Sequence, residues 1–436
     1  MPAALPPVEP PRGPQLRTSH DLPVHDVLIV GGGLVGASLA IALDRVGIDV
    51  ALLEAAPPGA LPAVFDERNL SFAEATVNAL TALGVLQKLR GPSGAIERIH
   101  ISRRGDFGRT VLEASRHGRS EFGRVVVARD FGEALEARLG ELPRLLRYRP
   151  VRFVGCEPVT DAAFREVRIA DAGGERIIRT RLLVGADGTR SGVREALGIA
   201  ADHHDYNQTL FVTRLRAQRP PDGTAYERLG DHGPTALLPR GDRYYGLVHA
   251  VPGEQADAVD ALDEAGFLAH AQAAFGWRVG RFVSCGARSV YPASRVVAGR
   301  ITSERAVLVG NAAQTIHPIG AQGFNLGLRD ALTLAELIQS EVTAAGGNDA
   351  GLDCGSRELL GAYAQQRHED RQRTLQFSDG LARLSADRSA MMRPLRSLGL
   401  LALGRMDSVQ SLLVGGALGY RGQVPALCRS AAEVRP

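Results

Sequence analysis

Two glycine-rich turns in the sequence have residue types that suit the binding of a nucleotide. The first, "VGGGLVGA", places Gly31, Gly33 and Gly36 in a G-x-G-x-x-G pattern, and Glu54 closes the next apolar run. Glycines at this spacing let the backbone approach a pyrophosphate at a helix N-terminus, and an acid about 20 residues later can bind two ribose hydroxyls. The pattern predicts a dinucleotide site. The alternative is a tight turn in an unrelated α/β domain.

The second turn lies in "AVLVGNAAQTIHPIGAQGFNLGLRDA", residues 306–331, which begins like a buried strand and ends like a helix. If the dinucleotide is FAD, its ribityl chain must run from the first turn toward another part of the chain. Asn311 would then hydrogen-bond ribityl or pyrophosphate oxygens, and Gly320 and Gly323 would admit a flat ring. We expect a helix from about residue 324 to 338 to direct its positive end at the flavin, where negative charge collects on reduction.

Strands and helices must position these turns. Residues 25–56 have the pattern of strand, glycine turn, helix and second strand, which is a βαβ unit. The stretch "IRTRLLVGADGTRSGVREALGI" repeats strand, turn and helix, with Asp187 and Gly188 at the turn. Other segments alternate apolar and polar residues, as antiparallel strands do. The sequence therefore predicts an α/β fold with an α+β substrate lobe: a Rossmann-like FAD-binding domain interleaved with an antiparallel-sheet substrate domain, and a helical C-terminus.

The expected domains follow the order of these segments, because 436 residues exceed what one hydrophobic core normally spans. We expect a disordered Pro-rich tail over 1–24, an FAD-binding domain made of 25–95, 128–204 and 299–340, a substrate domain made of 96–127 and 205–298, and a helical region over 341–436.

Composition and charge exclude several classes of function. The 51 basic and 48 acidic residues nearly balance, so nothing favours a nucleic-acid partner. A hydrophobic content of 44% and a mean hydropathy of -0.05 argue against multiple membrane spans. The N-terminal stretch has many prolines and no apolar run, which argues against a secretory signal. The four scattered cysteines suit a reducing cytosol, so we expect a cytoplasmic protein.

The single dinucleotide fingerprint narrows the class of enzyme. A disulfide reductase would need a second Rossmann unit and a reactive cysteine pair, and the chain has no C-x-x-C motif. A simple NAD dehydrogenase would not explain the second glycine turn. No cluster of metal-ligand residues is evident in the sequence, so no metal is expected.

Three motifs taken together, "GGGLVG", "GADG" and "GNAAQTIHPIGAQGFNLGLRD", resemble those of flavin-dependent aromatic hydroxylases of the p-hydroxybenzoate hydroxylase type. Within that family the chain is most similar to the ubiquinone-biosynthesis branch. The resemblance implies a single-component monooxygenase with FAD as cofactor, NAD(P)H as transient co-substrate, and dioxygen and a polyprenyl phenol as substrates. It leaves room for other ubiquinone-biosynthesis proteins as partners and for peripheral contact with the inner face of the membrane.

The resemblance also implies which residues touch the cofactor, while no catalytic residue is assigned. The ADP half would contact Gly31, Gly33, Gly36 and Glu54, with Arg68 near the pyrophosphate or ribose; further cofactor contacts would come from Val35, Arg124, Asp187, Gly188, Gly310, Asn311, Gln322, Gly323 and Asn325; and His317, Pro318, Gly320, Gln322 and Gly323 would line the flavin. There are two departures. The branch commonly has alanine-glycine where this chain has Gly320 and Ala321, and Arg124 stands where some relatives have a ribityl-binding glutamine.

Simpler structural roles remain open for several of these residues. Arg68 could be an ordinary surface arginine, because Lys88 is the only lysine of the chain and clusters of arginine reflect composition. His317 could hydrogen-bond the backbone of its turn, and we favour that role over acid-base catalysis. Asp187 could cap the following helix. Tyr244 and Tyr245 are expected on opposite faces of a strand.

Two other functions remain open at this point. One is another aromatic-ring flavin hydroxylase, or a flavin reductase that acts on isoprenoids without inserting oxygen. The other is a flavin-binding scaffold of a biosynthetic assembly. The segment 391–420 has too many interruptions to span a bilayer. We expect it to pack on the core, although docking of a partner or contact with a membrane surface would also suit its composition.

Overall fold

The computed structural model describes most of the chain. The described residues are 23–63, 66–159, 163–345 and 353–386 and, toward the C-terminus, 394, 397–399, 402, 410, 414–416, 418–420 and 422–429. Most of the expected Pro-rich tail, and most of the segment 391–420, therefore lie outside the described residues.

One sheet of eight strands is built on a parallel core. Its order is β18 (Thr302–Ser303), β19 (Ala306–Leu308), β11 (Gly174–Gly185), β1 (Val24–Val30), β2 (Val50–Leu53) and β8 (Leu146–Tyr148), and the strands from β19 to β8 run parallel. Of the other two strands, β10 (Arg165–Asp171) pairs antiparallel with β11, and β9 (Arg152–Cys156) pairs antiparallel with β10. All four residues of β2 are buried, as expected for a parallel strand covered on both faces.

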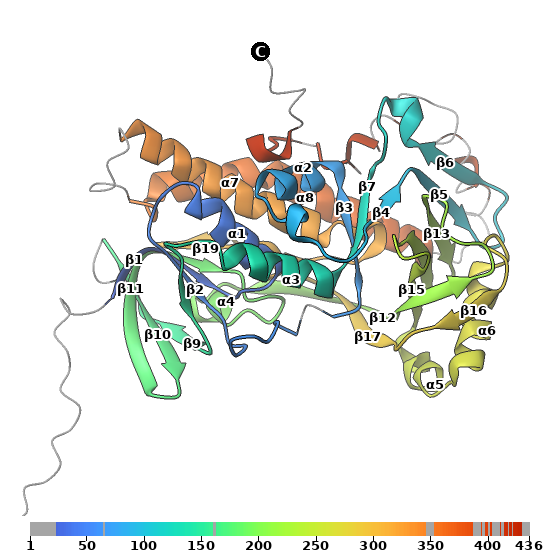
Figure 1. Cartoon of the computed structure of the whole chain (residues 1–436), viewed down its shortest axis with the longest axis horizontal. Coiled ribbons are helices and arrows are strands. Elements are labelled where there is room, and N and C mark those ends of the chain that lie inside the picture. Colours follow the sequence, from blue (N-terminus) through green and yellow to red (C-terminus); the bar gives the residue numbers. More distant parts are fainter. Residues whose placement is uncertain are drawn as a thin grey trace, which may run out of the picture.

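Long helices pack against this sheet and share its hydrophobic core. These are α1 (Leu34–Asp44), α3 (Ala128–Leu139) and α7 (Gly323–Ala344), with α8 (Arg357–Ala386) packed along α7. Figure 1 shows α1, α3, α7 and α8 on the same side of the sheet, whereas the β9–β10 hairpin extends from the other side. The short α4 (Gly192–Ala196) follows β11 and contacts β9.

The second sheet has nine strands and forms the other lobe. Its order is β20 (Gln314–Thr315), β17 (Ser289–Ala298), β12 (Ala201–Ala217), β15 (Tyr245–Pro252), β14 (Gly233–Pro239), β13 (Thr224–Gly230), β5 (Arg98–Arg103) and β6 (Arg109–Glu113), with β16 (Phe282–Cys285) beside β12. One pair, β13 with β5, is parallel, because two distant parts of the chain meet there. The helix α6 (Glu264–Phe275) covers one face, and α5 (Ala256–Asp260) precedes it. Tyr245 is buried under α6 in this face.

A small third sheet lies between the two large ones. It consists of β3 (Asn69–Ala73), β7 (Gly123–Val127) and β4 (Gly94–Ile96), and α2 (Glu74–Ala82) continues from β3. It comes very close to the nine-stranded sheet. A Cβ atom added to Gly246 would lie 2.2 Å from Nδ2 of Asn69, and one added to Gly94 would lie 2.0 Å from the carbonyl oxygen of Pro239. Glycine is therefore required at both contacts.

The predicted fold class is confirmed, with a parallel α/β lobe, a largely antiparallel lobe and a helical C-terminal part. Segments of the two lobes alternate along the chain, as the colours of Figure 1 show. The four cysteines are free thiols. Among the helices that the structure describes, none combines the length and apolar character needed to cross a bilayer.

Gly327 tests the contact between α1 and α7. A Cβ atom at this position would lie 2.9 Å from both Cα of Gly310 and Cγ2 of Val35, so Gly327→Ala must push backbone apart. We expect the free energy of unfolding to fall by about 1–3 kcal/mol, measured by urea denaturation.

Gly361→Ala is the matched control. Gly361 is exposed within α8, and nothing lies within 4 Å of an added Cβ. Alanine has the higher helix propensity, so this variant should gain stability, by up to about 1 kcal/mol. A stable Gly327→Ala protein would show that the two helices do not depend on close contact.

Candidate functional site

Four of the residues singled out in the sequence lie at one edge of the parallel sheet. Glu54 follows β2, Gly31 follows β1, Asp187 follows β11 and Gly310 follows β19, and these strands are neighbours in that order. Parallel strands place their carboxyl ends on the same side, which is where open α/β sheets bind ligands. The three separated motifs thus share one edge.

The first glycine turn leaves the N-terminus of α1 open. Gly31 has φ +107°, and a Cβ atom added to Gly36 would lie 1.9 Å from the carbonyl oxygen of Gly31. Gly33 is the N-cap residue and has no side chain to bind the first amides of α1. The unpaired N–H groups of the first helical turn form an anion site. This donor set fits the pyrophosphate of FAD.

Glu54 lies directly beside this turn. Its Oε2 accepts a hydrogen bond from the amide of Gly32 at 2.9 Å, and its Oε1 accepts one from the amide of Ala56 at 2.7 Å. These contacts hold the carboxylate next to the glycine turn, where the second half of a nucleotide-binding motif must lie. The position suits a ribose whose hydroxyls donate to a carboxylate.

The second glycine turn touches the first. Gly310 has φ +60°, and a Cβ atom added there would lie 2.9 Å from Cγ2 of Val35 on α1. The next residue, Asn311, is exposed. The structure thus brings together two turns that lie far apart in sequence, so one elongated ligand can contact both.

The loop that leads into α7 has a strained backbone. Gly320 has φ +73° and Ala321 has φ +51°. Ala321 is therefore left-handed, which costs an alanine roughly 1–2 kcal/mol. Pro318 and Gly320 are exposed, and Nε2 of Gln322 donates to the carbonyl oxygen of Gly320 at 3.2 Å.

The N-terminus of α7 has open donors. No side chain caps this end of the helix, and no acidic residue lies in the first turn, which Gly323 begins. Its positive end is therefore available to an electron-rich group such as the flavin edge.

His317 has the structural role favoured from the sequence. Its Nδ1 accepts from the amide of Ile319 at 3.2 Å, so the ring proton lies on Nε2, which donates to Oε1 of Gln208 at 3.1 Å. The ring is buried, and burial lowers the pKa of His317 to about 4. Neutral His317 joins the second turn to β12.

Asn325 is buried and holds the second turn against β3. Its Oδ1 accepts from the amide of Ala73 at 2.9 Å and from Oγ1 of Thr76 at 2.7 Å. Its Nδ2 donates to the carbonyl oxygens of Ser71 at 3.0 Å and Ala321 at 2.9 Å. In this structure the side chain joins elements and presents no free polar group to a ligand.

Asp187 caps the start of α4. Its carboxylate accepts from Oγ of Ser191 at 2.5 Å and from the amide of Val193 at 3.0 Å. Gly188, at φ +85°, has open space where a side chain would be. The carboxylate of Asp187 is thus committed to the start of α4.

The two predicted arginines are both paired with acids. Arg68 pairs with Asp66 at 2.8 Å and lies over the ring of Tyr291, whose hydroxyl donates to Asp66. Burial opposes the charge on Asp66, but its contacts with Arg68 and Tyr291 prevail and lower its pKa. Arg124 pairs with Glu121 at 2.7 Å. Arg68 thus joins the first lobe to the nine-stranded sheet.

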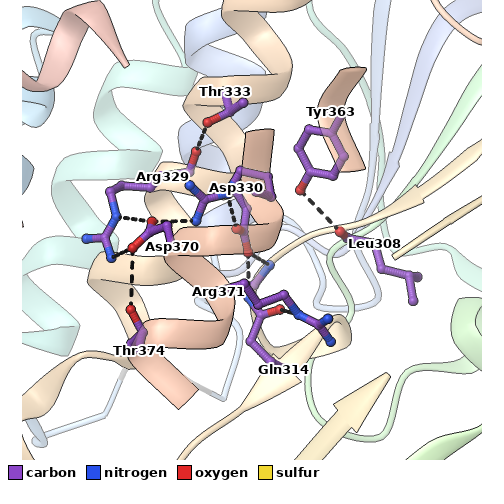
Figure 2. A network of polar contacts seen from close by, with 11 residues as sticks. Leu308, Gln314, Arg329, Asp330, Thr333, Tyr363, Asp370, Arg371 and Thr374 are labelled. Carbon is purple, nitrogen blue, oxygen red and sulfur yellow. Dashed lines mark hydrogen bonds and ion pairs between the residues drawn. The ribbon is translucent and has the colours of Figure 1, made fainter. Parts of the chain in front are cut away.

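A buried network of ion pairs holds the second glycine turn in place (Figure 2). Arg329 binds Asp370 at 2.7 Å, and Arg367 binds both Asp370 and Asp330 at 2.8 Å. The other oxygen of Asp330 accepts from the amide of Gly310 at 3.1 Å and from Nε2 of Gln314 at 2.6 Å. The network therefore fixes the backbone at the turn itself.

Two further buried arginines, Arg194 and Arg103, were not singled out in the sequence. Arg194 donates to the carbonyl oxygens of Ala312 and Thr189, both at 2.9 Å, and Arg103 is buried and paired with Asp231 at 2.6 Å. The interpretation of arginine clusters as composition alone is wrong for these residues. A usable signal was present: Arg329 and Asp330 interrupt an otherwise apolar helix face.

Comparisons with known proteins agree with this arrangement. Residues 24–378 match the family described as FAD binding domain. The chain is 33% identical to the ubiquinone hydroxylase UbiL of Rhodospirillum rubrum over 91% of this chain and 90% of that protein. It is 28% identical to the 3-demethoxyubiquinol 3-hydroxylase of Escherichia coli over 90% of this chain and 98% of that protein. The p-nitrophenol 4-monooxygenase PnpA of Pseudomonas putida shares the fold, with TM-score 0.74, 17% identity, and coverage of 92% of this chain and 100% of that one.

Asp370→Asn tests the ionic network. The substitution leaves Arg329 and Arg367 buried without their shared counter-charge, so the free energy of unfolding should fall by about 3–5 kcal/mol in urea denaturation at neutral pH. Glu369→Gln is the control, because Glu369 forms an exposed pair with Arg373 one helical turn away. It should cost about 0.5 kcal/mol or less. Equal losses in both variants would contradict a supporting role for the network.

Proposed function

The chain belongs to the family of FAD-dependent aromatic-ring monooxygenases, and on this basis we propose that it hydroxylates the ring of a polyprenyl phenol in ubiquinone biosynthesis. The observation that most supports the proposal is the contact of both glycine turns at one sheet edge, in a chain 33% identical to a ubiquinone hydroxylase. The stretches "HGPTALLP", "AFGWRVG" and "LVGNAAQTIHP" resemble 2-octaprenyl-6-methoxyphenol hydroxylase in particular.

FAD is the cofactor, and NAD(P)H is the co-substrate. When bound, FAD supplies the redox chemistry that passes electrons from NAD(P)H to dioxygen. The chain's own residues hold the cofactor, orient the substrate and shield the reaction from water. We propose that the open amides of α1 bind the pyrophosphate, Glu54 the ribose, and Asn311 the ribityl chain. The uncapped N-terminus of α7 would stabilise negative charge on the ring.

The nine-stranded sheet offers a wall for an apolar substrate. Its face toward the second turn presents Leu210 and Val212 from β12 and Ala250 from β15, all buried. Apolar side chains suit an aromatic ring with an isoprenoid tail and exclude water from the reaction. The opposite face is covered by α6.

Labelled dioxygen tests the proposed reaction. The purified FAD-loaded protein is given NADPH, 2-geranylphenol as a short polyprenyl phenol, and ¹⁸O₂. We expect one ¹⁸O atom in each hydroxylated product, because one oxygen atom enters the ring and the other leaves as water. A parallel reaction in H₂¹⁸O should give unlabelled product. A reduced, unlabelled product would indicate a reductase, and NADPH oxidation that the phenol does not stimulate would indicate a scaffold.

Retention of FAD tests the proposed contacts. Glu54→Gln and Asn311→Ala should each lower the flavin content of the purified protein, because each removes a polar contact to the cofactor. Absorbance at 450 nm after gel filtration measures this content. Glu341→Gln, an exposed substitution near the far end of α7, should keep full flavin content. Full occupancy in all three variants would refute the proposed contacts.

A further inference from the structure

The side chain of Glu227 on β13 has a buried acceptor that the protein does not use. Its Oε1 atom is shielded from solvent and has no hydrogen-bond partner among the residues that the structure describes. A buried carboxylate oxygen without a partner is costly, and an ordered water, a ligand or a reaction that uses the group can offset this cost. The cost calls for an explanation.

The register of the strands shows which face of the sheet Glu227 occupies. Glu227 lies opposite Ala236, Ala236 opposite Val248, and Val248 opposite Val212. Directly opposite residues of antiparallel strands point to the same face, so these four side chains form one row across the sheet.

This row lies on the same face of the sheet as the residue of β12 that contacts the second glycine turn. Gln208 lies four residues before Val212 on the same strand and therefore points to the same side, and Oε1 of Gln208 accepts from His317 in that turn. The alternate residues, such as Phe211 and Leu247, pack under α6 on the other face. Glu227 thus belongs to the wall that the proposed substrate would contact.

The surroundings of Glu227 are apolar. Ala236 and Ile101 lie opposite it on the two neighbouring strands, and Ala225 and Leu229 flank it on its own strand and face. Glu227 as a whole is half-buried, but its carboxyl group is shielded, and this burial raises the pKa of Glu227 to about 7. The carboxyl group therefore changes its charge near neutral pH, where a general base is most effective.

Charged side chains on the two elements that neighbour β13 here are already paired. Arg103 on β5 binds Asp231 at 2.6 Å. The helix α8, which packs against β13, presents Asp379 and Arg383, which pair with each other at 2.9 Å. None of these groups contributes to the pKa shift of Glu227.

We propose that Oε1 of Glu227 accepts the hydrogen bond of the substrate's phenol O–H and takes its proton as the new C–O bond forms. The inference rests on the proposed function, since it places a phenol against this wall. It gives the reaction the one catalytic residue that the sequence does not reveal.

The proton transfer balances within the known stoichiometry. As the ring carbon forms its bond to an oxygen atom derived from dioxygen, electron density flows from the phenol oxygen into the ring, and the O–H proton passes to Glu227. The ring carbon then releases its hydrogen as a proton to solvent, the phenol oxygen regains its proton from Glu227, and the ring is aromatic again. The second oxygen atom leaves as water, with two electrons supplied by NAD(P)H.

Ligand binding without turnover provides the first test. In the absence of NADPH, the FAD-loaded protein is titrated with 2-geranylphenol and with its methyl ether, which lacks the O–H donor. Hydrogen bonds to charged acceptors contribute about 1.5–3 kcal/mol, so above pH 7 the phenol should bind at least about tenfold more tightly than the ether. Below pH 7, Glu227 is protonated and the preference should fade.

The Glu227→Gln variant gives the decisive comparison. Its phenol-to-ether preference should not change with pH, because an amide does not ionise in this range. Its kcat for hydroxylation should fall by about 10²–10⁴-fold, with full FAD content. Glu97→Gln is the control. Glu97 lies just before β5 and is exposed, so this variant should behave as wild type. Glu227→Asp, which keeps the carboxylate, should recover part of the activity and the pH dependence, and it serves also if the glutamine variant does not fold.

The possible outcomes distinguish the role of Glu227 from the proposed function of the protein. If the wild type hydroxylates 2-geranylphenol and Glu227→Gln keeps both kcat and a pH-dependent preference, the role of Glu227 is refuted while the proposed function stands. If the wild type hydroxylates no polyprenyl phenol at all, the proposed function fails, and the proton-transfer role fails with it.

Discussion

The whole site depends on one steric contact, where α1, the second glycine turn and α7 meet. Val35, Gly310 and Gly327 come so close that two of the three positions have no room for a side chain. This contact sets the distance between the open amides of α1 and those of α7. Because both helix ends point at the same sheet edge, a single elongated cofactor can be held at its anionic middle and at its aromatic ring.

The polar residues behind this contact give it rigidity. Asp330 binds the amide of Gly310 on one side and Arg367 on the other, and Asp370 completes the charge balance. Burying ions is costly unless each one is paired and hydrogen-bonded, and here the pairs extend from the turn into α8. Asn325 and His317 connect the second turn to β3 and β12 through uncharged hydrogen bonds. The loop at Ala321 can therefore keep its strained backbone, because its neighbours are fixed.

Much of this arrangement was predictable from local patterns. The apolar runs that end in Gly31, Asp187 and Gly310 predict strands and turns by themselves, and the helix between β1 and β2 predicts that these two strands pair in parallel. The supporting residues were not predictable in the same way. Arg194, Arg367 and Asp370 gain their roles from partners far away in sequence, and the high arginine content hid them. The position of Glu227 requires the register of four strands, which no local pattern supplies.

The parallel pairing of β13 with β5 was not predictable either, because it also depends on contacts between distant parts of the chain. Alternation in the sequence indicates a strand but not its neighbour, so the one parallel pair of the predicted antiparallel sheet was not predictable. Asp187 and Asn325 show a second limit, because a motif does not determine what each of its side chains contacts. Each lies in a motif expected to bind the nucleotide, yet in the structure each uses its side chain to hold the backbone of its own motif.

The interleaving of the two lobes also determines when the site can exist during synthesis. A ribosome releases α1 early, but the segment that closes against Val35 emerges only after nearly three quarters of the chain. Until then the nucleotide turn lacks its opposite half, and the apolar side of α1 that α7 will cover stays open to other nascent chains or to chaperones. Assembly of the flavin pocket is thus a late event, and an early termination anywhere before Gly310 would leave a fragment that cannot enclose its cofactor.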